Sequence, residues 1–404
     1  MIIARAPRYS RTLRVRHAGD DELPAVRAVG ERAFGHTFPS SFYPAGTTLV
    51  GEDSAGRMVC SLVYRPAPGF WGRARVPMAA PGGVGTHPDH RQRGYAGALM
   101  VHTLRILRER GIAASPLYPF SFPYYAKFGW AVGALATTIA SRPSLLAQLG
   151  RPDGVRRARS SDLPAIKRAY SRFARAHNAC TDRPAAWWSD GRHTWLPHAS
   201  DPTARWLVHE DRRGRVDGYA HLHTRPRHDE EGVSVDVKEL VGPPEAERAL
   251  AAALGKVRDA SRIDILLPMD SALPAYLPCR TGMQLQQRFA FRVVDPTRAL
   301  TSLKPERDLP GPVRYRVWDW TLSRERPVEV CVRAAEGRVV ESRSRRAPKL
   351  TCTVNTFSQL FSGFLSAQKA VAMGLAEVSA GRAAELSDAL LFGRVPFRSY
   401  NEPG

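Results

Sequence analysis

The stretch GVGTHPDHRQRGYAGALMVHTLRILRERG, residues 83–111, decides the fold of the first third of the chain. It runs from the end of an apolar strand through a basic, glycine-containing loop into an amphipathic helix, which Gly111 ends. The segment from Arg91 to Ala96 fits the pattern Gln/Arg-x-x-Gly-x-Gly/Ala. Because a helix N-terminus offers unpaired N–H donors and a positive dipole end, this loop suits a pyrophosphate. The bare pattern is equally typical of a structural turn, so both interpretations stay open here.

The residues of the loop fit the phosphate interpretation in detail. Gly94 allows the backbone to approach phosphates closely, and Ala96 with Gly97 keeps the first helical turn thin. Arg91 and Arg93 add positive charge next to the helix N-terminus.

The chain resembles itself at an offset of 140 residues, because VRHAGDDELPAVR (15–27) aligns with VRRARSSDLPAIK (155–167). Each copy predicts a short strand, a helix N-cap region and a proline in the first helical turn. A hairpin, a further strand and a second helix follow in both copies. A period this long is typical of a duplicated domain and not of a solenoid. The predicted fold class is therefore α/β (α+β).

The pattern changes from about residue 313 to short strands, followed by helical periodicity over residues 356–374. RDLPG, residues 307–311, has the composition of a linker. A chain of 404 residues exceeds what one hydrophobic core usually organises. We therefore expect three domains: a first half (1–150), a second half (151–300) and a C-terminal part (301–404).

The net charge of +21, from 59 basic and 38 acidic residues, is the most unusual feature of the composition. It would attract nucleic acid, anionic membrane surfaces or a phosphorylated cofactor, although arginines spread over the whole chain are equally typical of a solvated surface. No apolar run approaches the roughly 18 to 20 residues of a membrane span. The five cysteines have no paired spacing, which favours a reducing, cytoplasmic location.

Four segments of this chain, in this order, resemble the Eis (enhanced intracellular survival) family of GNAT N-acetyltransferases. They are GVGTHPDHRQRGYAG (83–97), LYPFSFPYYAKFGW (117–130), FAFRVVDPTRAL (289–300) and APKLTCTVNTFSQLFSG (347–363). The resemblance implies two fused GNAT-like domains followed by a sterol-carrier-protein-like domain, assembled as a homo-hexamer. It also implies metal-free acetyl transfer from acetyl-CoA to a primary amine of the aminoglycoside, polyamine or lysine type.

The resemblance assigns the acetyl-CoA contacts to the strand end and to the loop. The implied residues are Val84, Gly85, Thr86, Arg91, Gln92, Arg93, Gly94, Tyr95, Ala96 and Gly97. The first three would pair through their backbone with the pantetheine arm, and most of the others would hold the pyrophosphate. The family often has Arg where Gln92 stands, so one cationic contact is missing here.

Transfer to an amine requires removal of an ammonium proton and protonation of the departing thiolate. Tyr125 aligns with the family's general acid, and a phenol with a pKa of about 10 stays protonated at neutral pH. Tyr124 is adjacent, but the spacing to Phe128 and Gly129 favours Tyr125. The alternative is that both tyrosines only pack in an aromatic core.

The general base of the family is the C-terminal carboxylate, which here belongs to Gly404. Relatives typically end in an aromatic residue soon after a similar Pro-aromatic pair, whereas this chain continues through Glu402 to Gly404. Glu402 or water is therefore an alternative base.

The second half has lost the loop pattern, since VKELVG (237–242) leads directly into PPEAERAL (243–250), with acidic residues where phosphates would lie. We expect no CoA site there. His221, His223 and His228 are expected on a surface strand and not in a metal site. The alternative to an enzyme is a nucleic-acid-binding or lipid-binding protein on a non-catalytic GNAT scaffold.

Overall fold

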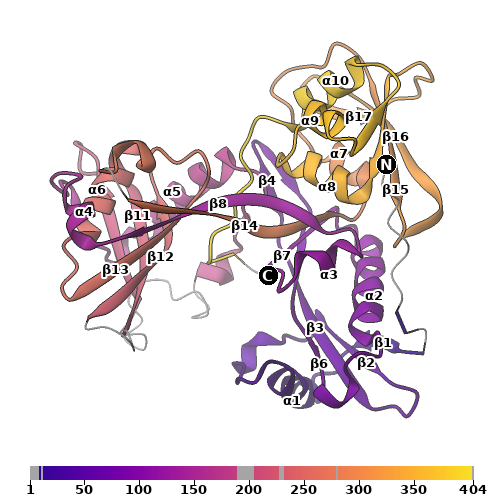
Figure 1. Ribbon diagram of the computed structural model, residues 1–404, viewed down its shortest axis with the longest axis horizontal. Helices are drawn as coiled ribbons and strands as arrows, with labels where there is room; N and C mark the ends of the chain where they lie inside the picture. Colours follow the sequence, from indigo (N-terminus) through magenta and orange to yellow (C-terminus); the bar gives the residue numbers. More distant parts are fainter. Residues whose placement is uncertain (1–8, 11, 189–203, 227–231, 279–280, 403–404) are drawn as a thin grey trace.

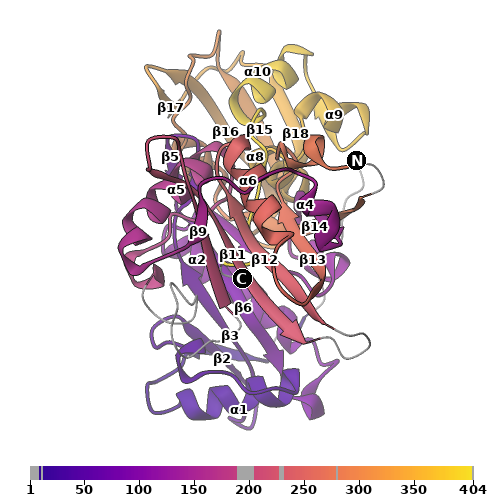
Figure 2. The same ribbon diagram turned by 90° about the vertical axis from the view of Figure 1, so that its left-hand side faces the viewer.

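The computed structural model describes residues 9–10, 12–188, 204–226, 232–278 and 281–402. Figure 1 shows three lobes: the first half at the lower right, the second half at the left and the C-terminal part at the upper right. In Figure 2, turned by 90°, the C-terminal part and the first half lie at opposite ends with the second half in front of them.

The first half contains a four-stranded sheet in the order β1-β2-β3-β6. Its strands are β1 (Arg14–His17), β2 (Thr48–Glu52), β3 (Met58–Pro66) and β6 (Ala79–Thr86). Helices α1 (Leu23–Phe34) and α2 (Tyr95–Glu109) cover opposite faces, because α1 packs on Val50 and Val63 whereas α2 packs on their neighbours Leu49 and Leu62. The short hairpin of β4 (Gly69–Trp71) and β5 (Ala74–Val76) precedes β6.

The two halves share one eight-stranded sheet in the order β7-β14-β8-β13-β12-β11-β10-β9. The strands are β7 (Ala114–Leu117), β8 (Ala131–Ser141), β9 (Val155–Arg157), β10 (Ala204–Glu210), β11 (Val216–Pro226), β12 (Val233–Val241), β13 (Ala260–Leu267) and β14 (Gly282–Val293). Strand β14 of the second half lies between β7 and β8 of the first, and β8 lies between β14 and β13. The long strands β8 and β14 therefore bridge the lobes (Figure 1). A division at residue 150 separates segments of the chain but does not separate the sheet.

The remaining helices of the two halves lie on this sheet or at its ends. They are α3 (Phe122–Ala126), α4 (Pro143–Ala147), α5 (Leu163–Ala176), α6 (Pro244–Leu254) and α7 (Pro296–Thr301). Each of these five helices has a proline at its first or second position, where the missing N–H costs nothing.

Equivalent polar contacts confirm that the two halves are structural repeats. Arg16 pairs with Glu22 and Glu52 at the base of the first half. Arg156, 140 residues later in the sequence, pairs with Asp162 and Glu210 in the second. The hairpin turns match as well. In the first half, Asp53 accepts hydrogen bonds from the backbone and side chain of Arg57; in the second, residues 211 and 215 make the same contacts.

The C-terminal part is a five-stranded sheet in the order β17-β16-β15-β18-β19. It comprises β15 (Val313–Asp319), β16 (Ser323–Ala335), β17 (Arg338–Glu341), β18 (Lys349–Thr353), β19 (Ala376–Val378), α8 (Val354–Ser362), α9 (Ala367–Ala372) and α10 (Arg382–Leu391). The helical periodicity expected over residues 356–374 is interrupted, because Gly363 adopts φ +86° and ends α8. The sterol-carrier-like character of this part stays a prediction.

Candidate functional site: the opening between β6 and β7

Strands β6 and β7 begin side by side and then separate. Met78 and Ala114 form an isolated parallel bridge, after which the two strands belong to different sheets (Figure 1). Within its four-stranded sheet β6 pairs with β3, and no strand of the described residues covers its other edge beyond the bridge at Met78. A register irregularity opposite β3 coincides with Gly83, whose φ of +59° favours glycine. The predicted pantetheine contacts, residues 84–86, follow this irregularity on the uncovered edge strand.

The basic loop leads to the N-terminus of α2, as the sequence predicts. Gly94 is the N-cap residue in left-handed conformation at φ +76°, and no side chain caps the helix. The first-turn N–H groups, from Tyr95 to Gly97, have no acceptor among the described residues. Unpaired donors at the positive end of a 15-residue helix form a site that fits a pyrophosphate.

The arginines of the loop contact the protein as well. Arg91 donates from Nη2 to the carbonyl of Ala33 at 2.8 Å, which ties the loop to the end of α1. Arg93 donates to the carbonyl of Asp89 at 3.4 Å, and Gln92 between them has φ +62°. All ten residues that the resemblance assigns to acetyl-CoA therefore lie at the end of β6, in the loop or in the first turn of α2.

A second structural constraint, which the sequence did not reveal, favours glycine at position 94. A Cβ there would lie 2.9 Å from the backbone nitrogen of Ser10 and 3.2 Å from Cα of Tyr9. Gly97 is also tightly packed, since a Cβ there would lie 3.2 Å from the ring of Phe128. These glycines allow the loop and the first turn of α2 to pack against the N-terminal segment and the segment after α3, and they would also allow a phosphate to approach closely.

We expect Gly94→Glu to weaken CoA binding by at least roughly tenfold, about 1.4 kcal/mol, because it places an anion against the phosphate position. Isothermal titration with CoA measures the change. Gly214→Glu is the matched control: Gly214 also has a left-handed φ, of +70°, but a Cβ there meets only open space on a distant turn. Equal CoA affinity of the Gly94 variant and the control would refute the loop assignment.

Tyr125 lies in the short helix α3 beside the separating strands. Ser121 caps this helix by accepting a hydrogen bond from the backbone N–H of Tyr124. The Tyr125 side chain is buried among Tyr124, Phe120 and Trp130, and this burial raises the pKa of its phenol above the ordinary value. Its hydroxyl has no hydrogen-bond partner among the described residues. The phenol is thus protonated, and its hydroxyl makes no hydrogen bond to a described residue.

Burial also raises the pKa of Tyr124, to about 12, so both tyrosines are protonated at neutral pH. Tyr124 contacts Lys127 and Phe128, whereas Tyr125 contacts Trp130. The aromatic-core alternative therefore describes the rings of both residues correctly, and it leaves the hydroxyls of both tyrosines without a hydrogen-bond partner among the described residues.

Sequence reasoning missed Asn355, which holds α3 in place from the C-terminal part. Its Nδ2 donates to the carbonyl of Ala126 at 2.9 Å and to that of Trp130 at 3.2 Å. Asn355 lies within the segment APKLTCTVNTFSQLFSG, so its motif was visible in the sequence although its contact was not.

Glu402 does not serve as a free base, which corrects the alternative raised from the sequence. Its carboxylate is buried, with Oε1 accepting from the Tyr170 hydroxyl at 2.6 Å and Oε2 from the backbone N–H of Thr181 at 3.0 Å. Arg183 pairs with it at 3.1 Å. Both oxygens are engaged inside the second half. Gly404, the predicted base, lies outside the described residues.

The second half lacks the features of the first-half site. Eight residues, 87–94, connect β6 to α2, whereas only Gly242 and Pro243 connect β12 to α6. The pairing registers also place Glu239 of β12, the partner of His221, where Gly82 stands in β6 as the partner of Val63. Burial opposes ionisation of Glu239, but Arg183 holds its pKa below the ordinary value. A buried carboxylate replaces the glycine, and the connection that corresponds to the basic loop is shorter; the absence of a CoA site in this half stays a prediction.

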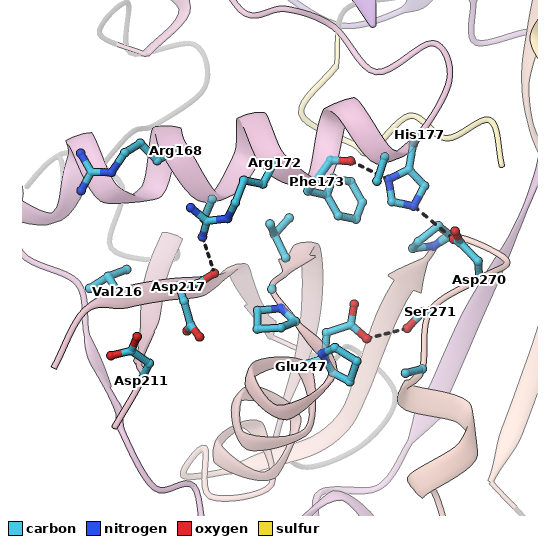
Figure 3. A pocket seen from close by; sticks show the side chains of 18 of the residues that line it. Arg168, Arg172, Phe173, His177, Asp211, Val216, Asp217, Glu247, Asp270 and Ser271 are labelled. Carbon is cyan, nitrogen blue, oxygen red and sulfur yellow. Dashed lines mark hydrogen bonds and ion pairs between the residues drawn. The ribbon is translucent and has the colours of Figure 1, made fainter. Parts of the chain in front are cut away.

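A hollow of about 920 Å³ lies in the second half (Figure 3). Arg172 of α5 and Glu247 of α6 line it. Burial raises the pKa of Glu247, and Ser271 donates to its carboxylate.

The expectation of a surface strand is wrong for His221. Its side chain is buried and stacked on Trp206 at 3.9 Å between ring centroids, and it contacts His223 and Asn401. Burial lowers its pKa, so it is neutral. His228 lies outside the described residues, and within the described part of the chain no group of three or more His, Cys, Asp or Glu is arranged to hold a metal.

Comparison with known proteins agrees with this geometry. Residues 14–133 and residues 179–293 each match a family model described as an acetyltransferase (GNAT) domain. No curated protein matches the chain. Among the described helices none is long and apolar enough to cross a membrane.

Three solved structures are similar to almost the whole chain. A GCN5-related N-acetyltransferase from Anabaena variabilis is 19% identical with a TM-score of 0.81, and the match covers 95% of this chain and 98% of that one. One from Kribbella flavida is 22% identical with a TM-score of 0.77, covering 95% and 97%. Eis1 from Mycobacterium abscessus is 20% identical with a TM-score of 0.74, covering 97% and 100%. With two matched domains and this likeness in fold, the chain is an acetyltransferase of the GNAT family with an Eis-like architecture.

Proposed function

We propose that this protein transfers the acetyl group of acetyl-CoA directly to a primary amine, in a ternary complex formed in the opening between β6 and β7. The observation that carries the proposal is the uncapped N-terminus of α2, with its free first-turn N–H groups, next to the uncovered edge of β6. When bound, acetyl-CoA supplies an activated thioester. The edge of β6 would hold its pantetheine arm, and the N–H groups of residues 95–97 would bind its pyrophosphate.

In the proposed mechanism, Tyr125 donates its phenolic proton to the departing thiolate sulfur. Its raised pKa keeps this proton in place until the thiolate forms. The carboxylate of Gly404 takes the proton from the attacking ammonium. The geometry that favours Gly404 over Glu402 is the complete engagement of the Glu402 carboxylate inside the second half.

The test is turnover with a panel of amines: spermidine, kanamycin and a lysine-containing peptide, each with acetyl-CoA and a thiol reagent that reports free CoA. We expect thiol release with at least one amine and a rise in Tm on addition of CoA. The proposal would be refuted if no amine is acetylated and CoA does not raise the Tm.

Nucleic-acid binding is a second candidate because the net charge is +21. Such binding predicts an affinity for DNA or RNA that falls steeply with salt. Titration of a labelled duplex at two salt concentrations tests it. Assembly as a hexamer and a cytoplasmic location stay predictions, and light scattering of the purified protein tests the first of them.

A further inference from the structure

The C-terminal tail, residues 395–402, fills the opening that separates β12 from β13 in the second half. These strands pair from Val233 to Val237 and then diverge, just as β6 and β7 do in the first half. The tail enters beside Asn178, whose backbone N–H donates to the carbonyl of Val395 at 3.1 Å. The cavity lined by Glu239, Leu266 and the tail residue Phe397 has a volume of about 10 Å³. The tail therefore occupies the place that corresponds to the proposed acetyl-CoA opening of the first half.

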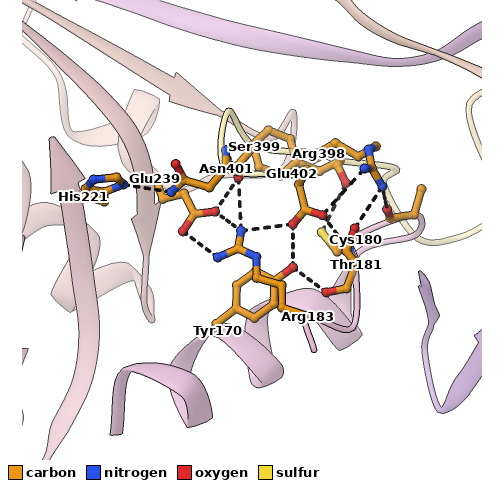
Figure 4. Close-up of polar contacts among 12 residues, drawn as sticks. Tyr170, Cys180, Thr181, Arg183, His221, Glu239, Arg398, Ser399, Asn401 and Glu402 are labelled. Atoms are coloured by element: carbon orange, nitrogen blue, oxygen red, sulfur yellow. Dashed lines mark hydrogen bonds and ion pairs between the residues drawn. The ribbon is translucent and has the colours of Figure 1, made fainter. Parts of the chain in front are cut away.

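A buried ionic cluster holds the tail in this position (Figure 4). Arg183 lies between Glu239 of β12 and Glu402 of the tail, and Arg398 of the tail is 3.8 Å from Glu402. All four charged side chains are 2% exposed or less. Ser399 of the tail also contacts the Glu239 carboxylate. Two guanidinium groups thus balance two carboxylates, and removal of either cation leaves a buried charge without a partner.

The other side of the tail contacts the first half. The hydroxyl of Tyr118, the residue after β7, donates to the carbonyl of Ser399 at 2.6 Å. Arg288 of β14 lies over the ring of Tyr118 at 4.6 Å and over that of Tyr400 at 4.1 Å. The tail is therefore held beside the end of β7. Only two residues follow Glu402 in the sequence, and an extended chain of two residues spans about 7 Å at most.

We propose that the second GNAT half has changed from a cofactor site into a clamp for the C-terminal tail, and that Arg183 and Glu239 are positioning residues for the terminal carboxylate. The inference rests on the proposed function, in which that carboxylate is the base. The clamp gives a physical role to the buried Glu239 and to the missing phosphate loop. In this proposal the second half, which does not bind CoA, holds the C-terminal tail for the first half, which does.

Arg183→Met tests the clamp through two separate measurements. Hydrogen exchange of a peptide covering residues 395–404 should become faster. With the amine that the unmodified protein acetylates fastest, kcat should fall roughly 10- to 100-fold while the KM for acetyl-CoA stays unchanged, because only the base is displaced. Arg183→Lys should restore part of kcat. Glu402→Gln, which keeps the shape of the side chain, should act in the same direction if the methionine variant does not fold.

Arg156→Met is the matched control, because Arg156 forms ion pairs with Asp162 and Glu210 in the same half, both at 2.7 Å, without touching the tail. It should leave exchange of the tail unchanged. Unchanged exchange in Arg183→Met would overturn the clamp, and faster exchange with unchanged kcat would overturn the positioning role. If the unmodified protein acetylates no amine, the proposed function fails, and the exchange measurement still decides whether the tail is clamped.

Discussion

Tyr125→Phe is expected to lower kcat by about 100-fold or more, which is the usual contribution of a positioned proton donor. The affinity for CoA should stay unchanged, because Tyr125 lies in α3 and does not belong to the loop or to the first turn of α2. Folding stability should also be nearly unchanged. The hydroxyl has no hydrogen-bond partner among the described residues, so its removal leaves no described buried group unpaired. Steady-state kinetics, CoA titration and thermal unfolding measure the three quantities.

Tyr124→Phe is the matched control for this experiment. Tyr124 is adjacent, also protonated and also packed in the aromatic cluster, so it should retain most of kcat. The pH dependence provides a further check. Since burial raises the pKa of Tyr125 above its ordinary value of 10, deprotonation of Tyr125 should cause no fall in kcat below pH 10. A loss of activity of equal size in both variants would assign the tyrosines to packing alone.

Arg292→Met is expected to lower the free energy of unfolding by about 3–5 kcal/mol, because it leaves a buried carboxylate without its cation. Arg292 of β14 is fully buried and donates to Asp319 of β15 at 2.7 Å. It also passes over Gly129, where a Cβ would lie 2.7 Å from Nε. The residue thus joins the shared sheet, the segment after α3 and the C-terminal part. Urea unfolding followed by tryptophan fluorescence measures the loss.

Arg316→Met is the control, since Arg316 pairs with Glu329 in the same sheet but both side chains are exposed, at 38% and 40%. An exposed pair contributes less than about 1 kcal/mol. Equal destabilisation by the two variants would contradict the importance of the buried pair.

Local features of this protein could be predicted from the sequence because neighbours in the chain produce them. The loop and helix of residues 83–111 follow from glycine conformation, charge and helical periodicity. The duplication was visible at Arg16 and Arg156, and both residues make equivalent ion pairs. The missing phosphate loop of the second half was likewise visible as the direct step from β12 into Pro243.

Other features depend on residues that are distant in the sequence, and the same reasoning could not reach them. Glu402 looked like a possible base, but Tyr170 and Arg183, more than 200 residues earlier, occupy its carboxylate. His221 was predicted to be a surface residue because the alternation of side chains along β11 contains no information about the tail that covers it. These errors share one cause: the C-terminal tail returns to the second half.

The sequence by itself determined the α/β class, the duplication and the basic loop that leads into α2, since backbone preference and periodicity are properties of short segments. Only the tertiary structure decided the sharing of β8 and β14 between the halves and the burial of the tail in the second half. The physical reason is that strand pairing and buried ion pairs join segments that are distant in the sequence. No local sequence pattern specifies which of these segments become partners.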